Sequence, residues 1–336
     1  MPLNTESKPA TTHPEPCRRF SVAPMMDWTD RHCRFFLRLL SKQTLLYTEM
    51  VTTGALLHND AHRFLQHHET EHPLALQLGG STPADLAACA KLAEAAGYDE
   101  VNLNVGCPSD RVQNNMIGAC LMAHPALVAD CVKAMRDAVA TPVTVKHRIG
   151  INGRDGYAEL CDFVGQVRDA GCRSFTVHAR IAILEGLSPK ENREVPPLRY
   201  DVAAQLKADF PDLEIVLNGG IKTLDACEAH LQTFDGVMLG REAYHNPYLL
   251  AEVDQRLFGS AAPVITRAEA LAQLRPYIVA HIESGGAMHH VTRHILGLGQ
   301  GFAGARRFRQ LLSSDIHKHP QPLVVLDQAA ELLAGR

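Results

Sequence analysis

Several patterns that would assign a chain to a common class are missing from these 336 residues. No apolar run approaches the ~18 residues that a membrane span needs. The nine cysteines form no C-x-x-C pair, which argues against a zinc ribbon and a disulfide framework. No G-x-G-x-x-G follows an early strand, so the fingerprint of an open dinucleotide-binding sheet is also absent. An odd cysteine count without a signal peptide fits a reducing cytoplasm, where we expect this protein, with no bound metal.

The two ends of the chain differ in composition from its centre. Residues 1–16 are rich in Pro, Thr and Glu and have no apolar signal core, so we expect a disordered leader over 1–19. The hydrophobic content of 46% is enough for a large core. The length exceeds the about 250 residues of a minimal barrel. We expect a barrel over 20–258 and a small C-terminal helical domain over 259–336.

Eight short apolar runs with helical stretches between them predict parallel strands buried on both faces. Three of these runs are Phe20–Met25, Leu45–Met50 and Gly236–Leu239. The other five end on a polar residue, at Gln77, Asn104, Lys146, His178 and Asn218. Strand-to-strand spacings of about thirty residues predict a (β/α)8 TIM barrel, an α/β fold. In this fold the C-terminal strand ends form the active-site mouth, so the five polar residues should meet in one pocket.

The stretches between the runs have helical patterns and helix boundary signals. Helices are expected over 82–97, 125–140, 156–171 and 202–210, with Gly97 and Gly171 as C-cap glycines. Beyond the barrel, 266–284 and 290–312 carry apolar residues at helical spacing. These two segments predict the helical domain.

The loop Asn104-Val105-Gly106-Cys107-Pro108-Ser109 follows the fourth predicted strand. A free cysteine is most often a buried small hydrophobe. Cys107 differs because strand-end loops carry the chemistry of a barrel. The other eight cysteines lie in the tail, in helices or at helix edges, and a structural role is expected for them.

Glycine-bearing turns follow the last two predicted strands, at Asn218-Gly219-Gly220 and Gly240-Arg241. Loops after strands seven and eight commonly form the phosphate site of a barrel. Together with Gln77, Lys146 and His178 they suggest a phosphorylated aromatic cofactor. Lys146 could stabilise an anionic reduced flavin, or act as a Schiff-base lysine as in barrel aldolases; the neighbouring amide and imidazole suit a heterocycle better.

The net charge of −4 argues against a nucleic-acid partner, but its distribution does not. Residues 289–319 contain five basic residues against the single acid Asp315, a local charge of +4. Arg306 and Arg309 are three apart and would share a helix face, as phosphate contacts often do. A solvated helix face is the alternative interpretation.

From about Phe20 to Lys318 the chain resembles the tRNA-dihydrouridine synthases, most closely their A-type branch. The resemblance is carried by Val22 to Thr29 (VAPMMDWT), Gln77 to Gly80 (QLGG), Asn104 to Ser109 (NVGCPS) and Val145 to Arg148 (VKHR). It continues in Val177 to Arg180 (VHAR), Gly186 to Arg193 (GLSPKENR), Thr292 to His294 (TRH), Leu296 to Leu298 (LGL) and Gly304 to Arg307 (GARR).

The resemblance implies an FMN enzyme that reduces the C5–C6 double bond of a D-loop uridine in tRNA, at positions 20 and 20a. NADPH is the expected reductant, with NADH as an alternative, and a monomer is expected. Hydride would pass from the flavin to C6, and Cys107 would protonate C5. The implied flavin contacts are Ala23, Pro24, Met25, Gln77, Lys146 and His178, with phosphate contacts at Asn218, Gly219, Gly220, Gly240 and Arg241. The implied tRNA contacts are Asn104, Arg180, Lys190, Arg193, Arg306 and Arg309.

Two positions depart from the family pattern. Ile181-Ala182-Ile183 stands where a basic residue and a Trp are expected, and Phe308 stands near a Trp position. Both concern RNA docking rather than chemistry. Two other functions stay open from the residues. One is a flavin barrel that reduces a free pyrimidine, as dihydroorotate or dihydropyrimidine dehydrogenases do, and the other is a non-catalytic RNA-binding barrel.

Overall fold

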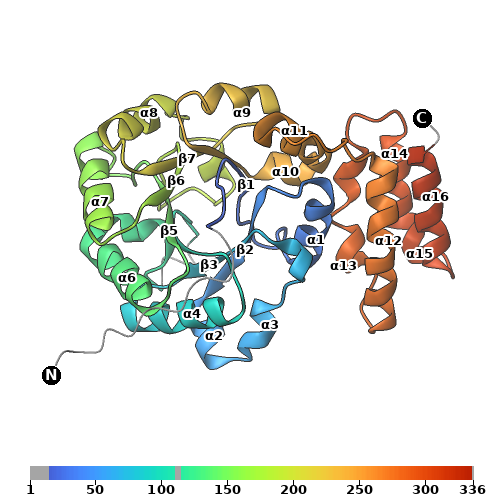
Figure 1. Cartoon of the computed structure of the whole chain (residues 1–336), viewed down its shortest axis with the longest axis horizontal. Helices are drawn as coiled ribbons and strands as arrows, with labels where there is room; N and C mark the ends of the chain where they lie inside the picture. Colours follow the sequence, from blue (N-terminus) through green and yellow to red (C-terminus); the bar gives the residue numbers. More distant parts are fainter. Residues whose placement is uncertain (1–14, 110–114, 335–336) are drawn as a thin grey trace.

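The computed structural model describes residues 15–109 and 115–334, in which eight parallel strands form a closed barrel in chain order (Figure 1). The strands are almost wholly buried, as expected of a parallel sheet covered by helices. The predicted (β/α)8 barrel is therefore confirmed. The strands are β1 Phe20–Val22, β2 Leu45–Thr52, β3 Leu74–Gly79, β4 Glu100–Val105, β5 Val143–Arg148, β6 Ser174–His178, β7 Glu214–Asn218 and β8 Gly236–Leu239.

Helices surround the barrel (Figure 1); α1 to α9 lie between successive strands along the chain, and α10 and α11 follow β8. The four predicted helices are present within a few residues of their expected ends. Gly97 and Gly171 have φ of 86° and 100°, as expected of residues that follow a helix end. The barrel helices are α1 Arg31–Leu40, α2 Thr53–His58, α3 Ala61–Leu65, α4 Pro83–Ala95, α6 Pro125–Ala138, α7 Tyr157–Asp169, α8 Tyr200–Asp209, α9 Leu224–His230, α10 Arg241–His245 and α11 Val253–Phe258.

The end of the expected leader is attached to the barrel. Residues 1–14 lie outside the described residues, whereas Arg18 is buried and its Nε donates to Glu100 Oε2 at 2.6 Å. Glu214 also contacts Arg18, at 2.9 Å. Because Glu100 begins β4 and Glu214 begins β7, Arg18 closes the end of the barrel opposite the mouth.

A helical region follows the barrel and packs beside α1 and α10 (Figure 1). The prediction of a helix over 266–284 is confirmed by α12, Arg267–Glu283. The helical pattern predicted over 290–312 is also confirmed, but the segment is not one continuous helix, because four glycines between 297 and 304 lower the helix propensity of its centre. The segment instead forms α13 His289–Thr292, a 3-10 turn Leu296–Gly299, α14 Ala305–Gln310 and a π-helical turn Leu311–Asp315, followed by α15 Ile316–Lys318 and α16 Pro322–Ala334.

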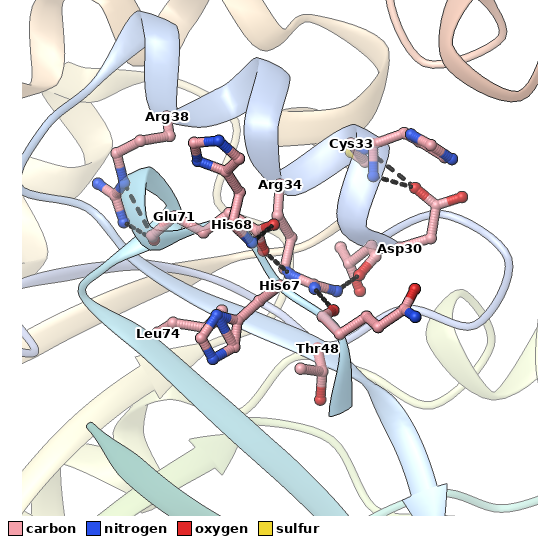
Figure 2. Close-up of polar contacts among 12 residues, drawn as sticks. Asp30, Cys33, Arg34, Arg38, Thr48, His67, His68, Glu71 and Leu74 are labelled. Atoms are coloured by element: carbon pink, nitrogen blue, oxygen red, sulfur yellow. Dashed lines mark hydrogen bonds and ion pairs between the residues drawn. The ribbon is translucent and has the colours of Figure 1, made fainter. Parts of the chain in front are cut away.

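Helix α1 carries two buried arginines that fix the chain around it (Figure 2). Arg34 pairs with Glu71 at 2.6 Å and donates to the carbonyl of Thr29 at 2.9 Å. Arg38 donates to the carbonyls of Glu71 and Thr44. These bonds tie the loop after β1 and the segment before β3 to one helix. None of the helices in the described part of the chain has the length and apolar content to span a bilayer.

Candidate active site

The five polar residues predicted at strand ends all lie at the C-terminal ends of neighbouring strands, β3 to β7. Register supports their convergence, since Asn104 is paired with Lys146 and His178 with Asn218. These residues therefore share one end of the barrel, as predicted.

Gln77 and Asn104 are fixed by a hydrogen-bond chain through the barrel interior. Asn104 Nδ2 donates to Gln77 Oε1 at 2.8 Å, and Gln77 Nε2 donates to Asn102 Oδ1 at 2.8 Å. Asn102 donates to Thr144 Oγ1 at 2.8 Å, and Thr144 donates to Glu100 at 2.6 Å. Each amide orientation follows from the next, back to the anchored Glu100. The mouth is thus preorganised from the opposite end of the barrel.

Two side chains hold the backbone of the loop that carries Cys107. The Asn104 side-chain oxygen accepts from the backbone N–H groups of Gly106 and Cys107, at 3.1 and 3.0 Å. Arg148 Nε donates to the Gly106 carbonyl at 2.9 Å. The Cys107 side chain is partly exposed, unlike the buried Cys33, Cys89 and Cys131. This is the position of a thiol that can meet a substrate while its backbone stays fixed.

Lys146 and His178 line the mouth as bases with lowered pKa. Burial, and then the charge of Arg148, lower the pKa of Lys146 to about 7. Its Nζ donates to Asn218 Oδ1 at 3.2 Å, and Asn218 in turn donates to the Met238 carbonyl at 2.8 Å. Burial, followed by the charges of Arg148 and Lys146, holds the pKa of His178 well below its usual range. His178 is therefore a neutral imidazole at pH 7, and Lys146 is poised to gain charge beside an anion.

The turn after β7 brings backbone against His178. Gly219 has φ of 119°, and a Cβ there would lie 2.8 Å from His178 Cδ2. Gly220 has φ of 71°, and a Cβ there would lie 2.4 Å from Leu198. Both positions need glycine for space and for conformation. By contrast, a Cβ on Gly240 would meet Ala23 and Met25 at ordinary distances of 3.7 and 3.8 Å.

The loop after β1 is a compact turn beside Gly240. Met25 N donates to Thr29 Oγ1 at 2.9 Å, and the Met25 carbonyl accepts from Thr29 N at 2.9 Å. Ala23 is buried, while Pro24 and Met25 are partly exposed. Gly240, Ala23 and Met25 therefore lie together at the mouth. They bring together the loops that follow the first strand, β1, and the last strand, β8.

Basic side chains gather around the loop between β6 and α8. Arg241 pairs with Glu194 at 2.6 Å, and Arg180 donates to the carbonyl of Pro196. Burial, and then the charge of Arg241, lower the pKa of Arg193. Lys190, at the start of the 3-10 turn Glu191–Arg193, is exposed. Several cations share few acids here, which is the electrostatic setting of an anion site.

Arg306 and Arg309 are exposed on α14, on the helical region beside the barrel. Their neighbour Arg307 pairs with Asp315 at 2.7 Å. Within residues 15–109 and 115–334, neither Arg306 nor Arg309 forms an ion pair with an acid. Phe308, one of the departures from the family pattern, is fully buried in this region. That departure therefore lies in the core and not on the exposed face.

Arg148 is a site residue that the sequence interpretation did not assign. Besides the Gly106 carbonyl, it donates to the carbonyls of Ile181 and Asn192, both at 2.9 Å. One side chain thus connects the Cys107 loop to the loop of Lys190 and Arg193. The available signal was its position two residues after Lys146, since residues i and i+2 of a strand point to the same face.

A TIM barrel with a partly exposed thiol, a lysine of lowered pKa and glycine-bearing turns at its mouth has the arrangement of a barrel enzyme. Comparison with known proteins narrows this class. A family model described as dihydrouridine synthase (Dus) matches residues 21–333, and the chain belongs to that family. It is therefore an oxidoreductase.

Relatives match over nearly their whole lengths. The chain is 88% identical over 336 residues to the tRNA-dihydrouridine(20/20a) synthase of Pseudomonas putida, covering 100% of both chains. It is 83% identical over 319 residues to that of Pseudomonas aeruginosa, covering 95% of this chain and 96% of the relative. The Escherichia coli protein of the same name is 58% identical over 330 residues, covering 98% and 99%.

Proposed function

We propose that this protein reduces the C5–C6 double bond of D-loop uridines in tRNA, at positions 20 and 20a, with FMN as cofactor and NADPH as electron donor. The observation that carries the proposal is the joint placement of Cys107, Lys146 and His178 at one mouth, within a chain of the dihydrouridine synthase family. A tRNA substrate is consistent with a cytoplasmic location. The relatives' printed names, which specify 20/20a, support the choice of uridine.

The donor set at the mouth fits FMN. A flavin ring presents alternating acceptors and donors, and Gln77 and His178 offer a side-chain amide and a neutral imidazole. The backbone at Gly219 and Gly220 is bare of side chains, as a phosphate cradle requires. Lys146 and Arg241 supply positive charge. These residues, with Asn218, Gly240 and the loop of Ala23, Pro24 and Met25, are proposed to hold the cofactor.

Reduced FMN, when bound, supplies a hydride for C6 of the uracil. The chain must then protonate C5 from the opposite face of the ring. Cys107 carries the partly exposed thiol at the mouth and is proposed to donate that proton. Asn104 holds the loop by accepting from the backbone N–H groups of Gly106 and Cys107, and it is proposed to contact the base.

The substrate base must leave the RNA stack, which costs a few kcal/mol. Contacts between cations and tRNA phosphates can offset that cost. We propose that Arg180, Lys190 and Arg193 at the mouth, with Arg306 and Arg309 on α14, supply these contacts. Arg148 is proposed to keep the two mouth loops in register. The barrel over 20–258 would perform the chemistry, and the region from 259 onward would dock the tRNA.

The test uses purified full-length protein and unmodified tRNA transcripts. The protein should be yellow and release FMN on denaturation, and NADPH with tRNA should give dihydrouridine at positions 20 and 20a by site-resolved mass spectrometry. Turnover of free uracil or orotate but not of tRNA would identify a free-pyrimidine reductase instead. A colourless protein that binds tRNA would identify a non-catalytic RNA-binding barrel. NADH replaces NADPH in a parallel reaction to determine the donor.

A further inference from the structure

Three histidines from distant parts of the chain meet where the barrel joins the helical region. His32 lies in α1, His281 in α12 and His290 in α13. One ring nitrogen from each lies within 4.8 Å of the other two. His32 is buried, His281 is half-buried and His290 is exposed, so the group opens to solvent on one side. These residues take no part in the active site described above.

Two of the three rings form hydrogen bonds outside the group. His32 Nδ1 lies 2.7 Å from the hydroxyl of Tyr277, which leaves Nε2 of that ring for another partner. The backbone of Ala287 hydrogen-bonds the ring of His281, whose Nε2 faces His290 Nδ1 at 3.2 Å. Metal-ligating histidines usually have such an outer partner, because it fixes the tautomer and the ring orientation.

Space and charge also favour the ligand form of the rings. A Cβ on Gly286 would lie 2.2 Å from His281 Cε1, so the absence of a side chain at 286 lets this ring sit in place. Burial is the main cause that lowers the pKa of His32 to about 4, and burial also lowers the pKa of His281. Neutral imidazole is the form that binds metal. Asp30 supplies nearby negative charge, while Arg31 opposes a cation.

We propose that His32, His281 and His290 bind one divalent transition-metal ion of the zinc type, which connects the barrel to the helical region. An all-imidazole set suits Zn²⁺ and its neighbours, and it does not suit Mg²⁺ or Ca²⁺, which take oxygen ligands. Three protein ligands leave a fourth position for water. With zinc–nitrogen bonds of about 2.0–2.1 Å, the three ring nitrogens must lie closer to one another than the 4.8 Å within which they now lie. Rotation of the accessible His281 and His290 rings supplies that movement. The expectation of no metal rested on the absence of cysteine motifs. Cysteine spacing gives no information about a site built from histidines that lie 9 and 249 residues apart (290 − 281 and 281 − 32).

The test measures Zn²⁺ binding to the full-length protein by equilibrium dialysis against a competing chelator, followed by elemental analysis. Wild type should bind one Zn²⁺ per chain, and His290→Gln should lose this binding. His290 is exposed, so the variant should fold and melt like wild type in EDTA. Tyr277→Phe keeps all three ligands but loses the bond to His32, and should bind about 10- to 100-fold more weakly. His319→Gln, which removes an exposed histidine of the same region, is the matched control and should bind like wild type.

Two further measurements separate this site from other zinc ligands. Added Zn²⁺ should raise the melting temperature of wild type and of His319→Gln, but not that of His290→Gln. X-ray absorption at the zinc edge should show only nitrogen and oxygen neighbours. Equal Zn²⁺ binding by wild type and His290→Gln would overturn the proposal. The close approach of His281 and His290 would then reflect only a hydrogen bond between their rings. Sulfur in the zinc shell would assign the ion to a cysteine and would also overturn it.

Discussion

Nζ of Lys146 lies 3.2 Å from Oδ1 of Asn218, across the mouth from strand β5 to strand β7. The Lys146 amine is partly buried, and its pKa is lowered to about 7, first by burial and then by the charge of Arg148. The protonated form of Lys146 is therefore less favourable in the folded protein than in water. A negatively charged group bound beside Lys146 would restore the pKa toward its ordinary value, which is how the site can favour an anionic reduced cofactor.

This cost predicts a pH-dependent effect of Lys146→Met on stability. In unfolded chains the lysine pKa is near 10.4, so between pH 7 and about 10 the unfolded state binds more protons than the folded state. Stability of flavin-free wild type should therefore rise with pH across this window, while the variant lacks this term. The stability advantage of Lys146→Met should be greatest near pH 7 and shrink toward pH 10. Urea unfolding at both pH values measures it; an advantage independent of pH would contradict the lowered pKa.

Lys146→Ala should also change the flavin itself. Because a lysine charge acts mainly on the anionic reduced form, the midpoint potential of bound FMN should fall in the variant. A spectroscopic redox titration measures the potential. An unchanged potential with FMN still bound would separate Lys146 from the flavin.

Cys107→Ala should abolish most dihydrouridine formation while FMN stays bound and NADPH still reduces it. Loss of a general acid typically lowers the rate by about 10²- to 10⁴-fold. The control is Cys120→Ala, because Cys120 is the partly exposed thiol nearest along the chain, and its thiol donates to the Ile117 carbonyl. Single-turnover assays on tRNA measure the rate. Near wild-type turnover by Cys107→Ala would remove the thiol from the mechanism.

The barrel could be predicted from sequence because its strands are short apolar runs, five of which end at a polar residue, and because four of the intervening helices have clear ends. The polar residue at each of five strand ends also predicted the site, since closure of the barrel brings all strand ends together. The strand pattern is local in the sequence, and the fold class then places every strand end at the same mouth. The positions of Gln77 and Lys146 at the mouth could be predicted from these two facts alone.

Contacts between distant segments could not be predicted in this way. Arg148 joins two mouth loops through backbone carbonyls, which have no sequence signal. The ion pair of Arg18 with Glu100 depends on the packing of the chain before β1 under the barrel. In each case tertiary packing decided the result.

Gly219→Ala should destabilise the protein and weaken FMN binding. The new Cβ would lie 2.8 Å from His178, at a φ of 119° that L residues rarely adopt, so we expect a cost of about 1–3 kcal/mol. Gly165→Ala is the matched control. Gly165 lies inside α7 with open space around it, and alanine there should stabilise by about 0.5–1 kcal/mol. Thermal unfolding and flavin release measure both effects; equal behaviour of the two variants would contradict the close approach to His178.

Asp30→Asn should loosen the join between the barrel and the helical region. Asp30 accepts from Arg293 at 2.6 Å and from His294 at 3.0 Å, while its other oxygen caps α1. Asparagine keeps the cap, so the expected loss of about 1–3 kcal/mol at pH 7 comes from the charged hydrogen bonds.

The same carboxylate gives the loss a pH dependence. Burial alone would raise the pKa of Asp30, but the hydrogen bond and charge of His294 outweigh burial and hold the pKa well below its usual range. The stabilisation by Asp30 is therefore complete above the unfolded pKa of about 3.9 and is lost as the pH falls below it. Urea unfolding should show a smaller difference between wild type and Asp30→Asn near pH 2 than at pH 7. A difference that stays constant would assign the effect to packing.

The double variant Arg306→Glu/Arg309→Glu should separate tRNA docking from chemistry. Both side chains are exposed on α14 and lack acidic partners in the described chain, so their reversal should leave folding, flavin content and NADPH oxidation near wild type. If they contact phosphates, tRNA affinity should fall strongly, and the slope of log affinity against log salt should flatten by about one unit per lost contact.

The matched control is Lys91→Glu/Arg173→Glu, which makes the same change in net charge at exposed positions near the end of α4 and before β6, at the opposite end of the barrel. Because long-range attraction falls with net charge in both variants alike, only a larger loss in the α14 variant reports direct contact. Titrations of tRNA at two salt concentrations decide between the two interpretations. Equal affinities and equal slopes for the two double variants would leave α14 as a solvated face with no part in tRNA binding.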